Sequence, residues 1–368
     1  MKGLTLKLII ISFLLFSLNG KIFGQAAGGS AVPFLLISPD ARASGMGEVG
    51  TAIADDINAI YWNPGGLGFL ETLEATQYER ETDEEPAPFR QISLAFSPWL
   101  PQFNADLYYS YLTFGTYIEE ISGTVAFNFI LMNLGEFQRT SPEGKEQGRF
   151  TSNEFAFGAS YGTRVSEDIG IGIQAKYIQS NLTPKTSTQP IAGTGISFAV
   201  DMGFLWRPTD IMEGIDDVFS FGINLQNFGP KMTYINEADP LPTTLRLGFS
   251  YLMFEDEYNS FLFAMDLSKL LVKRDSLGSD PLPNSLITGW ENKGMEVSIG
   301  AEYWYQEVVA LRGGYFYEPS TLGGRQFYNF GFGLRYDMMK LDFGYILTIE
   351  DNNPLANTMR FSFLFDWD

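Results

Sequence analysis

Apolar and polar residues alternate along most of the chain from about residue 90 to its end. Within Thr194–Trp206, six large apolar side chains fall on one face, and Gly, Ser, Ala and Asp fall on the other. The segments Tyr328–Tyr336 and Phe361–Asp368 show the same period of two. Because successive side chains of a β-strand point to opposite sides, this pattern predicts many strands, each with one strongly apolar face.

The residue types on the two faces distinguish a soluble β-sandwich from a membrane barrel. The polar faces carry mainly small residues rather than Lys, Glu and Thr, and the apolar faces carry Phe, Tyr and Leu. Tyr and Trp recur at strand ends, where the aromatic girdles of membrane barrels lie. Several strands reach the about 9–11 residues that a tilted strand needs to cross a bilayer. The pattern therefore predicts an all-β fold, a transmembrane antiparallel β-barrel.

The connections between strands alternate between short and long, as expected for periplasmic turns and extracellular loops. The short ones are Val165–Asp168, Glu255–Tyr258, Gln306–Glu307 and Asp337–Met339. The long ones are Asn133–Ser152, Asn181–Gly193, Phe228–Pro240, Lys269–Gly294, Glu318–Arg325 and Glu350–Asn357. About fifteen segments resemble strands, and single-chain bacterial barrels have an even number. We assign Glu71–Tyr78 outside the barrel sheet and predict about 14 strands that start near Arg90.

The N-terminus has the order of a secretory signal peptide. Lys2 and Lys7 precede an apolar run, Leu8–Leu18, and small or polar residues follow near Gly24. The run is too short to span about 30 Å of hydrocarbon, and no later stretch is apolar over about 18 residues. We therefore expect a signal peptide over 1–24, an N-terminal segment over 25–70, a barrel over 71–368, and no membrane helix.

Composition excludes several kinds of chemistry. The chain has no Cys and no His, so disulfides, thiolate metal sites and Ser-His or Cys-His nucleophiles are absent. We find no Asp-x-Asp-x-Asp-Gly calcium loop. The net charge of −20 argues against nucleic acid as a partner. We expect no catalytic, cofactor-binding or metal-binding residues and therefore no enzyme.

One short motif, Gly45-x-Gly47-x-x-Gly50, has the spacing of a dinucleotide-binding loop. Such a loop belongs to a βαβ unit, but here Ser38-Pro39 predicts a helix start, and Asn63-Pro64 soon ends a second helical piece, Ile57–Trp62. No βαβ unit fits this segment. We interpret the glycines as positions where a compact, helical and irregular segment turns tightly or approaches other backbone.

This N-terminal segment is the predicted filler of the barrel. Lumen-facing positions such as Gly203 and Gly331 are small, so the lumen is either open or filled by another part of the chain. We predict that the segment lies in the lumen as a hatch, with Asp40 and Arg42 against lumen charges. The candidate lumen charges are Lys176, Asp201, Arg246, Asp266, Glu302, Arg312, Arg335 and Asp342. In the alternative interpretation, these charges only solvate a wet lumen.

The same segment carries a family resemblance. Ala43–Gly47 followed by Ala59–Gly68 resembles the hatch of FadL-family outer-membrane proteins, and Ala31–Pro64 resembles more closely their PorV/PorQ branch. The matching hatch-motif residues are Ser38, Pro39, Asp40, Arg42, Gly45, Gly47, Asn63 and Pro64. The resemblance implies a fourteen-stranded FadL-like barrel in the lipid of the bacterial outer membrane. It also implies a part in type IX secretion, with a large translocon and secreted cargo proteins as partners.

The loop Lys269–Gly294 is the candidate partner-binding loop, because its apolar side chains are costly to expose. Leu271, Leu286 and Trp290 are the candidate contacts. In the alternative interpretation, the loop closes over the barrel mouth or extends its neighbouring strands. Two functions stay open: a secretion component that docks to the translocon and escorts cargo, or a FadL-like channel that takes up hydrophobic small molecules.

Overall fold

The computed structural model describes residues 29–71, 88–103, 106–141, 144–184, 193–208, 218–235, 237–275, 278–291, 294–350 and 353–367. The predicted signal peptide, its cleavage site and most of Glu71–Tyr78 lie outside these residues. No helix in the described ranges is both long and apolar enough to cross a membrane.

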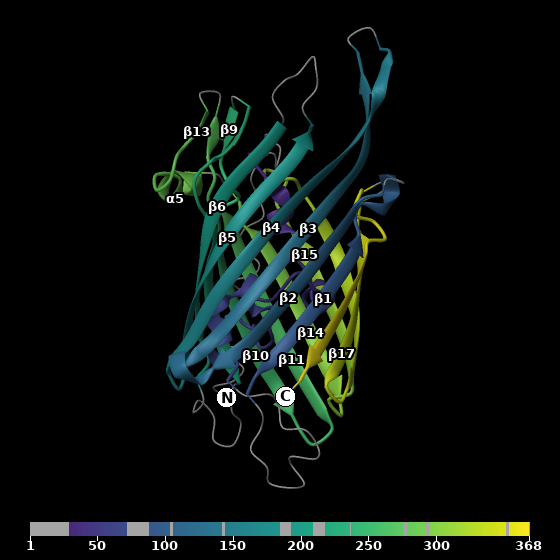
Figure 1. The fold of residues 1–368 in the computed structure, drawn as a ribbon. Helices are drawn as coiled ribbons and strands as arrows, with labels where there is room; N and C mark the ends of the chain where they lie inside the picture. Colours follow the sequence, from purple (N-terminus) through teal and green to yellow (C-terminus); the bar gives the residue numbers. More distant parts are fainter. Residues whose placement is uncertain are drawn as a thin grey trace.

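Fourteen antiparallel strands close into one barrel, in which each strand pairs with the next along the chain and the last pairs with the first (Figure 1). They are β1 (Arg90–Pro98), β2 (Tyr108–Ile118), β3 (Gly123–Thr140), β4 (Glu146–Ser166), β5 (Ile169–Thr183), β6 (Gly193–Trp206), β7 (Phe219–Phe228), β10 (Thr244–Glu255), β11 (Asn259–Leu270), β14 (Glu296–Tyr305), β15 (Val309–Tyr317), β16 (Gln326–Tyr336), β17 (Met339–Thr348) and β18 (Met359–Asp366). The prediction of about 14 strands from near Arg90 is confirmed.

The alternating pattern determines which side chains face outward. On β6, Ile196 and Phe198 are 50% and 60% exposed, whereas Ser197 between them is buried in the lumen. On β16, Phe330 is exposed and the neighbouring Asn329 is fully buried. Large apolar side chains therefore face the lipid, and small or polar ones face the interior, as the period of two predicts.

The two ends of the barrel differ in their connections. The four predicted short turns lie at one end, which we call the turn end, and the six stretches predicted as long connections lie at the other, the loop end. The predicted loop Asn133–Ser152 is wrong. β3 and β4 continue past the rim as a two-stranded ribbon, in which Phe137 pairs with Phe150 (Figure 1). Both faces of a ribbon outside the barrel meet water, so this sequence carries no apolar alternation.

Short elements lie in the other connections. The loop end holds a hairpin of β8 (Met232–Tyr234) and β9 (Glu237–Asp239) and a second one of β12 (Arg274–Asp275) and β13 (Gly278–Ser279), followed by α5 (Ser285–Thr288) and η5 (Gly289–Glu291). Two further turns are η3 (Pro101–Phe103) and η4 (Glu119–Ile121).

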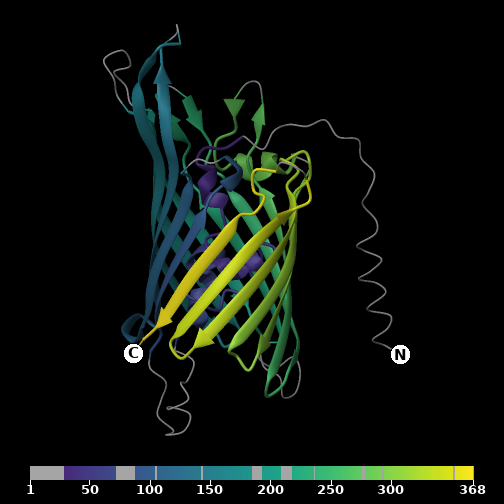
Figure 2. The ribbon, with the colours of Figure 1, turned by 90° about the vertical axis from the view of Figure 1, so that its right-hand side faces the viewer.

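The N-terminal segment lies inside the barrel, as predicted (Figure 2). This hatch consists of η1 (Pro33–Leu36), α2 (Ala41–Gly45), α3 (Ala59–Trp62) and η2 (Pro64–Phe69). η2 packs on β4, β5 and β6, and α2 packs on β16 and β17 on the opposite side. The hatch therefore bridges the lumen between two sides of the barrel.

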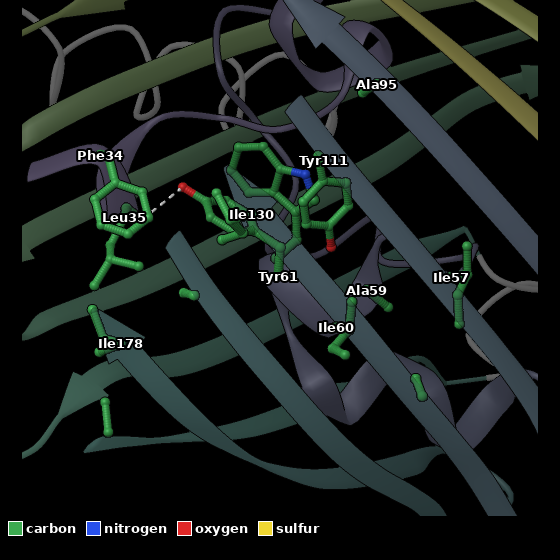
Figure 3. Packing of buried hydrophobic residues seen from close by; sticks show 14 of the residues in the cluster. Phe34, Leu35, Ile57, Ala59, Ile60, Tyr61, Ala95, Tyr111, Ile130 and Ile178 are labelled. Atoms are coloured by element: carbon green, nitrogen blue, oxygen red, sulfur yellow. Dashed lines mark hydrogen bonds between the residues drawn. The ribbon is translucent and has the colours of Figure 1, made fainter. Parts of the chain in front are cut away.

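An apolar cluster joins the hatch to the inner face of the barrel. Phe34, Leu35 and Tyr61 of the hatch lie beside Ile130 of β3 and Ile178 of β5 (Figure 3). The hydroxyl of Tyr61 donates a hydrogen bond to the carbonyl of Leu35 at 3.4 Å. Of these residues, Phe34 also lines the cavity described below.

Candidate functional site

Asp40 organises the hatch from within. Its Oδ1 accepts a hydrogen bond from the backbone N–H of Ala43 at 2.8 Å, which makes it the N-cap of α2. Its Oδ2 accepts from the indole Nε1 of Trp62 at 2.6 Å and so ties α2 to α3. The prediction that Ser38-Pro39 starts this helix is wrong, because Asp40 supplies the cap and the first turn begins at Ala41. Both hydrogen bonds of Asp40 stay within the hatch rather than reaching a lumen charge.

Arg42 is the hatch residue that reaches the barrel. Its guanidinium pairs with Asp55 of the hatch and with Glu302 of β14, the latter at 2.8 Å. Glu302 also pairs with Arg312 of β15, which in turn lies 2.7 Å from Asp342 of β17. The side chains of Glu302 and Arg312 are almost completely buried. A charged chain therefore runs from the hatch to β14 and β15 and across β16 to β17, near the turn end.

Three further polar contacts fasten the hatch around the barrel. One oxygen of Asp266 accepts from the backbone N–H groups of Gly50 and Thr51, both at 3.0 Å, and from the Thr51 hydroxyl. Glu48 pairs with Arg360 of β18 at 2.9 Å. The side-chain amide of Asn63 donates to the carbonyl of Phe204 in β6 at 2.9 Å. These contacts reach strands on several sides of the lumen.

Four of the predicted lumen charges bond to barrel residues or stack on an aromatic ring. Lys176 pairs with Asp201 at 2.8 Å, Arg246 donates to Gln226, and Arg335 lies over the ring of Trp304. Their positions agree with the prediction of a charged lumen. The sequence gives no indication of these particular partners.

The glycines of the hatch motif lie where the hatch backbone approaches neighbouring groups too closely for a side chain to fit. A Cβ on Gly45 would lie 2.7 Å from the Cα of Gly331, and one on Gly47 would lie 2.6 Å from the carbonyl of Ile299. Gly47 also has φ +74°, which L side chains rarely adopt. Gly50 packs on the ring of Trp62. The motif is therefore part of a close hatch–barrel contact, and the described residues around it, 29–71, form no βαβ unit.

Above the hatch, the loop-end half of the lumen holds a cavity of about 880 Å³. Its floor is formed by η1 and Trp62, and its sides by residues of β3, β4, β10, β11 and β14 to β18 and by the loop-end connections. The lining is mixed. Apolar side chains such as Phe34, Leu134 and Phe316 alternate with five carboxylates and three arginines. We call this space the mouth cavity.

Most charges of the mouth cavity are paired. Arg325 lies 2.9 Å from Glu318 and 3.2 Å from Glu296, and Arg360 pairs with Glu48. Glu291 pairs with Lys273 at the rim. Sequence reasoning did not identify these pairs, because no local pattern indicates them: Arg325 and Glu318 lie in one connection, whereas Glu296 and Arg360 lie on β14 and β18.

The predicted partner loop is folded against the barrel at one end and exposed at the other. Leu271 is only 3% exposed and packs under Gly289, whereas Trp290 is 52% exposed and Leu286 is half-buried. Ile287, next to Leu286, is 78% exposed. The structure therefore brings Leu286 and Trp290 to the surface around α5 and η5, and it places Leu271 beneath them. Their role in binding a partner stays a prediction.

In the described residues, no group of three or more carboxylates is arranged to hold a metal ion. Most charged residues of the hatch and mouth cavity form ion pairs or hydrogen bonds with other protein groups instead. The site therefore combines a hatch fixed in the lumen with the mouth cavity above it. Beside the cavity, Ile287 and Trp290 are exposed at the loop end, and we call these two side chains the apolar rim.

Comparison with solved structures identifies proteins that have a similar fold. The chain is similar to the P. putida toluene transporter TodX, with 10% identity, coverage of 89% of this chain and 98% of that one, and a TM-score of 0.52. It is also similar to CymD, a monoaromatic hydrocarbon channel, with 13% identity, coverage of 90% and 98%, and a TM-score of 0.51. At such low identity these likenesses show the fold alone, and they confirm the predicted FadL-like barrel.

Comparison with curated proteins gives no match. A family model described as "Type IX secretion system protein PorV" matches residues 24–276, more than half of the chain. Barrel, hatch and match together assign the protein to the bacterial outer membrane. The chain belongs to the PorV family of type IX secretion system proteins, and it is an outer-membrane component of that system.

Proposed function

We propose that this protein is a non-enzymatic docking component, which binds a large outer-membrane translocon and escorts secreted cargo to the cell surface. The observation that carries the proposal is the exposed apolar rim of Ile287 and Trp290 at the loop end. Exposed apolar patches outside the membrane mark interaction sites, and a few buried anchors carry most of an interface's energy. The family match supports a place in secretion.

The arrangement of the hatch also favours docking over conduction. Ion pairs and backbone contacts join it to strands on opposite sides of the lumen, from Phe204 on β6 to Arg360 on β18. Opening a path for a solute would break several of these buried contacts together. A docking protein needs no such opening, since its partners bind at the rim.

The test is the double variant Ile287→Ser with Trp290→Ser. We expect the barrel to assemble normally, because both side chains lie outside the membrane-spanning strands. Co-purification with the translocon should be lost, and secreted cargo should no longer be attached to the cell surface. The matched control is Ile121→Ser with Val165→Ser, two exposed apolar residues at the turn end, 47% and 56% exposed. Normal docking and cargo display in the rim variant would contradict the proposal.

A second candidate is a FadL-like channel for hydrophobic small molecules, favoured by the apolar part of the mouth cavity. It predicts that the rim variant displays cargo normally but takes up a long-chain amphiphile more slowly. Both assays are made on one strain, so intact display with impaired uptake would replace the first candidate by the second.

A further inference from the structure

Glu154 of β4 differs from the other carboxylates of the mouth cavity. It lies between Met132 of β3 and Ser180 of β5 in the strand register, with all three side chains on the lumen face. Its residue exposure is 6%, and it lines the cavity. One carboxylate oxygen accepts a hydrogen bond from the Ser180 hydroxyl at 2.7 Å.

Within the part of the chain that the structure describes, Glu154 has no cationic partner. The other four carboxylates of the lining, Glu48, Glu291, Glu296 and Glu318, each face an arginine or lysine. The lining as a whole carries five carboxylates against three arginines, a net charge of −2. A buried ionised carboxylate is costly unless it is paired. An incoming cation is therefore the group that would be stabilised here.

The side chains around Glu154 indicate what the rest of the ligand should be. Met132 is opposite it and belongs to the apolar cluster that includes Phe34, and Leu134, which also lines the cavity, packs against that cluster. An apolar stem packed on these side chains would be removed from water, and each buried methylene group contributes about 0.8 kcal/mol before association costs. An anionic head group would instead meet the excess of carboxylates.

We propose that the mouth cavity is a binding site for an organic cation, an ammonium or guanidinium group on an apolar stem, with Glu154 as its counter-ion. The site goes beyond the proposed docking function, which rests on the outer rim. The same chemistry is presented by a Lys or Arg side chain of a protein segment and by a free amphiphilic amine. The two sources are separated by experiment below.

Binding is measured with three fluorescent probes that differ only at one end. Dansylcadaverine carries a terminal ammonium, pentyl dansylamide is neutral, and dansyl-aminocaproate is anionic. They are titrated into the purified full-length mature protein in lipid nanodiscs, with empty nanodiscs as the blank. We expect the cationic probe to bind about tenfold more tightly than the neutral probe, and the anionic probe to bind least. Equal binding of the cationic and neutral probes would overturn the proposal.

The variants test Glu154 itself. Glu154→Gln keeps an oxygen for the Ser180 hydroxyl, so the barrel should stay folded, as its mobility on an unboiled gel will show. The cationic probe should fall to the affinity of the neutral probe. Glu154→Asp should keep the preference for the cation, and Glu136→Gln, a charge removal on the β3–β4 ribbon, should change nothing. Unchanged cation binding by Glu154→Gln would assign the site to another residue and overturn the proposal.

Cargo display separates the two sources of the cation. If a basic side chain of a secreted protein occupies the cavity, Glu154→Gln will reduce surface attachment of cargo while the rim residues are intact. If a free amine occupies it, the variant will lose probe binding with normal display. The rim variant in turn should keep probe binding, so failure of the docking proposal is distinguishable from failure of this one.

Discussion

The two halves of the lumen are built differently. At the turn end, Arg42, Glu302 and Arg312 form a buried charged chain, and hatch backbone lies directly on barrel glycines. At the loop end, the lumen holds a cavity of about 880 Å³, and β3 and β4 extend beyond the rim. The same strands thus support a packed, solid half and a hollow half. Substitutions should be poorly tolerated in the first half and should alter recognition in the second.

The largest expected effect is that of Gly314→Val. A Cβ at Gly314 would lie 2.1 Å from the backbone nitrogen of Gly47, so hatch and strand cannot both keep their places. Overpacking typically costs about 1–3 kcal/mol, and the cost is at the upper end or above it where the clash is with backbone, as here. We expect almost no folded barrel, measured as the fraction with shifted mobility on an unboiled gel. The adjacent Gly313→Val is the control, since nothing lies within 4 Å of a Cβ there. Similar assembly of the two variants would contradict the inference that the hatch packs tightly against this half of the barrel.

The next largest effect is the loss of stability expected when a buried charge is removed. Arg312→Met removes the buried partner of Glu302 and Asp342 at the turn end. Breaking a buried ion pair costs about 3–5 kcal/mol, because the remaining charges stay buried. Denaturant unfolding should show a loss of that size. Arg149→Met on the ribbon, whose pair with Glu136 is largely exposed, should cost less than about 1 kcal/mol. Equal losses would mean that the turn-end chain is hydrated.

The two halves of the lumen can be compared directly by the accessibility of introduced thiols to a bulky reagent. The natural chain has no Cys, so all labelling by a thiol reagent comes from the single Cys that is introduced. Ile287→Cys at the rim should react with a bulky thiol reagent on whole cells on the order of tenfold faster than Ser44→Cys in the hatch, which is fully buried. Equal rates would show an open pore through the hatch.

The smallest effect is expected on the ribbon. Phe137 stacks on Phe150 at 5.7 Å between ring centroids, outside the barrel. Phe137→Ala should change the free energy of unfolding of the barrel by no more than about 1 kcal/mol. Phe316→Ala, which removes a buried ring stacked on Phe327 inside the loop-end half, should cost about 3 kcal/mol. A large loss from Phe137→Ala would show that the ribbon supports the barrel.

The sequence predicted the barrel well because the membrane imposes a strict period. The alternation in Thr194–Trp206 and Tyr328–Tyr336 gave the correct outward faces, and the four short turns were found. Where that constraint ended, prediction failed. The ribbon around Phe137 has water on both faces, so its strands lacked the signal.

Prediction of the site was less complete, for a different reason. The type of contact made by Arg42 was foreseen, but its partner Glu302 is 260 residues away and no local pattern indicates it. Asp40 was expected to face a lumen charge, yet it caps α2 and binds Trp62. Glu154 was missed because a lone carboxylate on a lumen face acquires meaning only from its neighbours on two other strands.

The contacts between the hatch and β18 also constrain the order in which the protein can be completed. The backbone N–H of Ala41 donates to the hydroxyl of Ser362, 321 residues later, and Glu48 pairs with Arg360. During synthesis the first of these residues must therefore wait for nearly the whole chain before their partners exist. Long-range pairing of this kind slows folding and leaves apolar strands unpaired meanwhile. The segment that fills the lumen precedes every barrel strand in the chain, and its contacts with β18 can form only once that strand is in place.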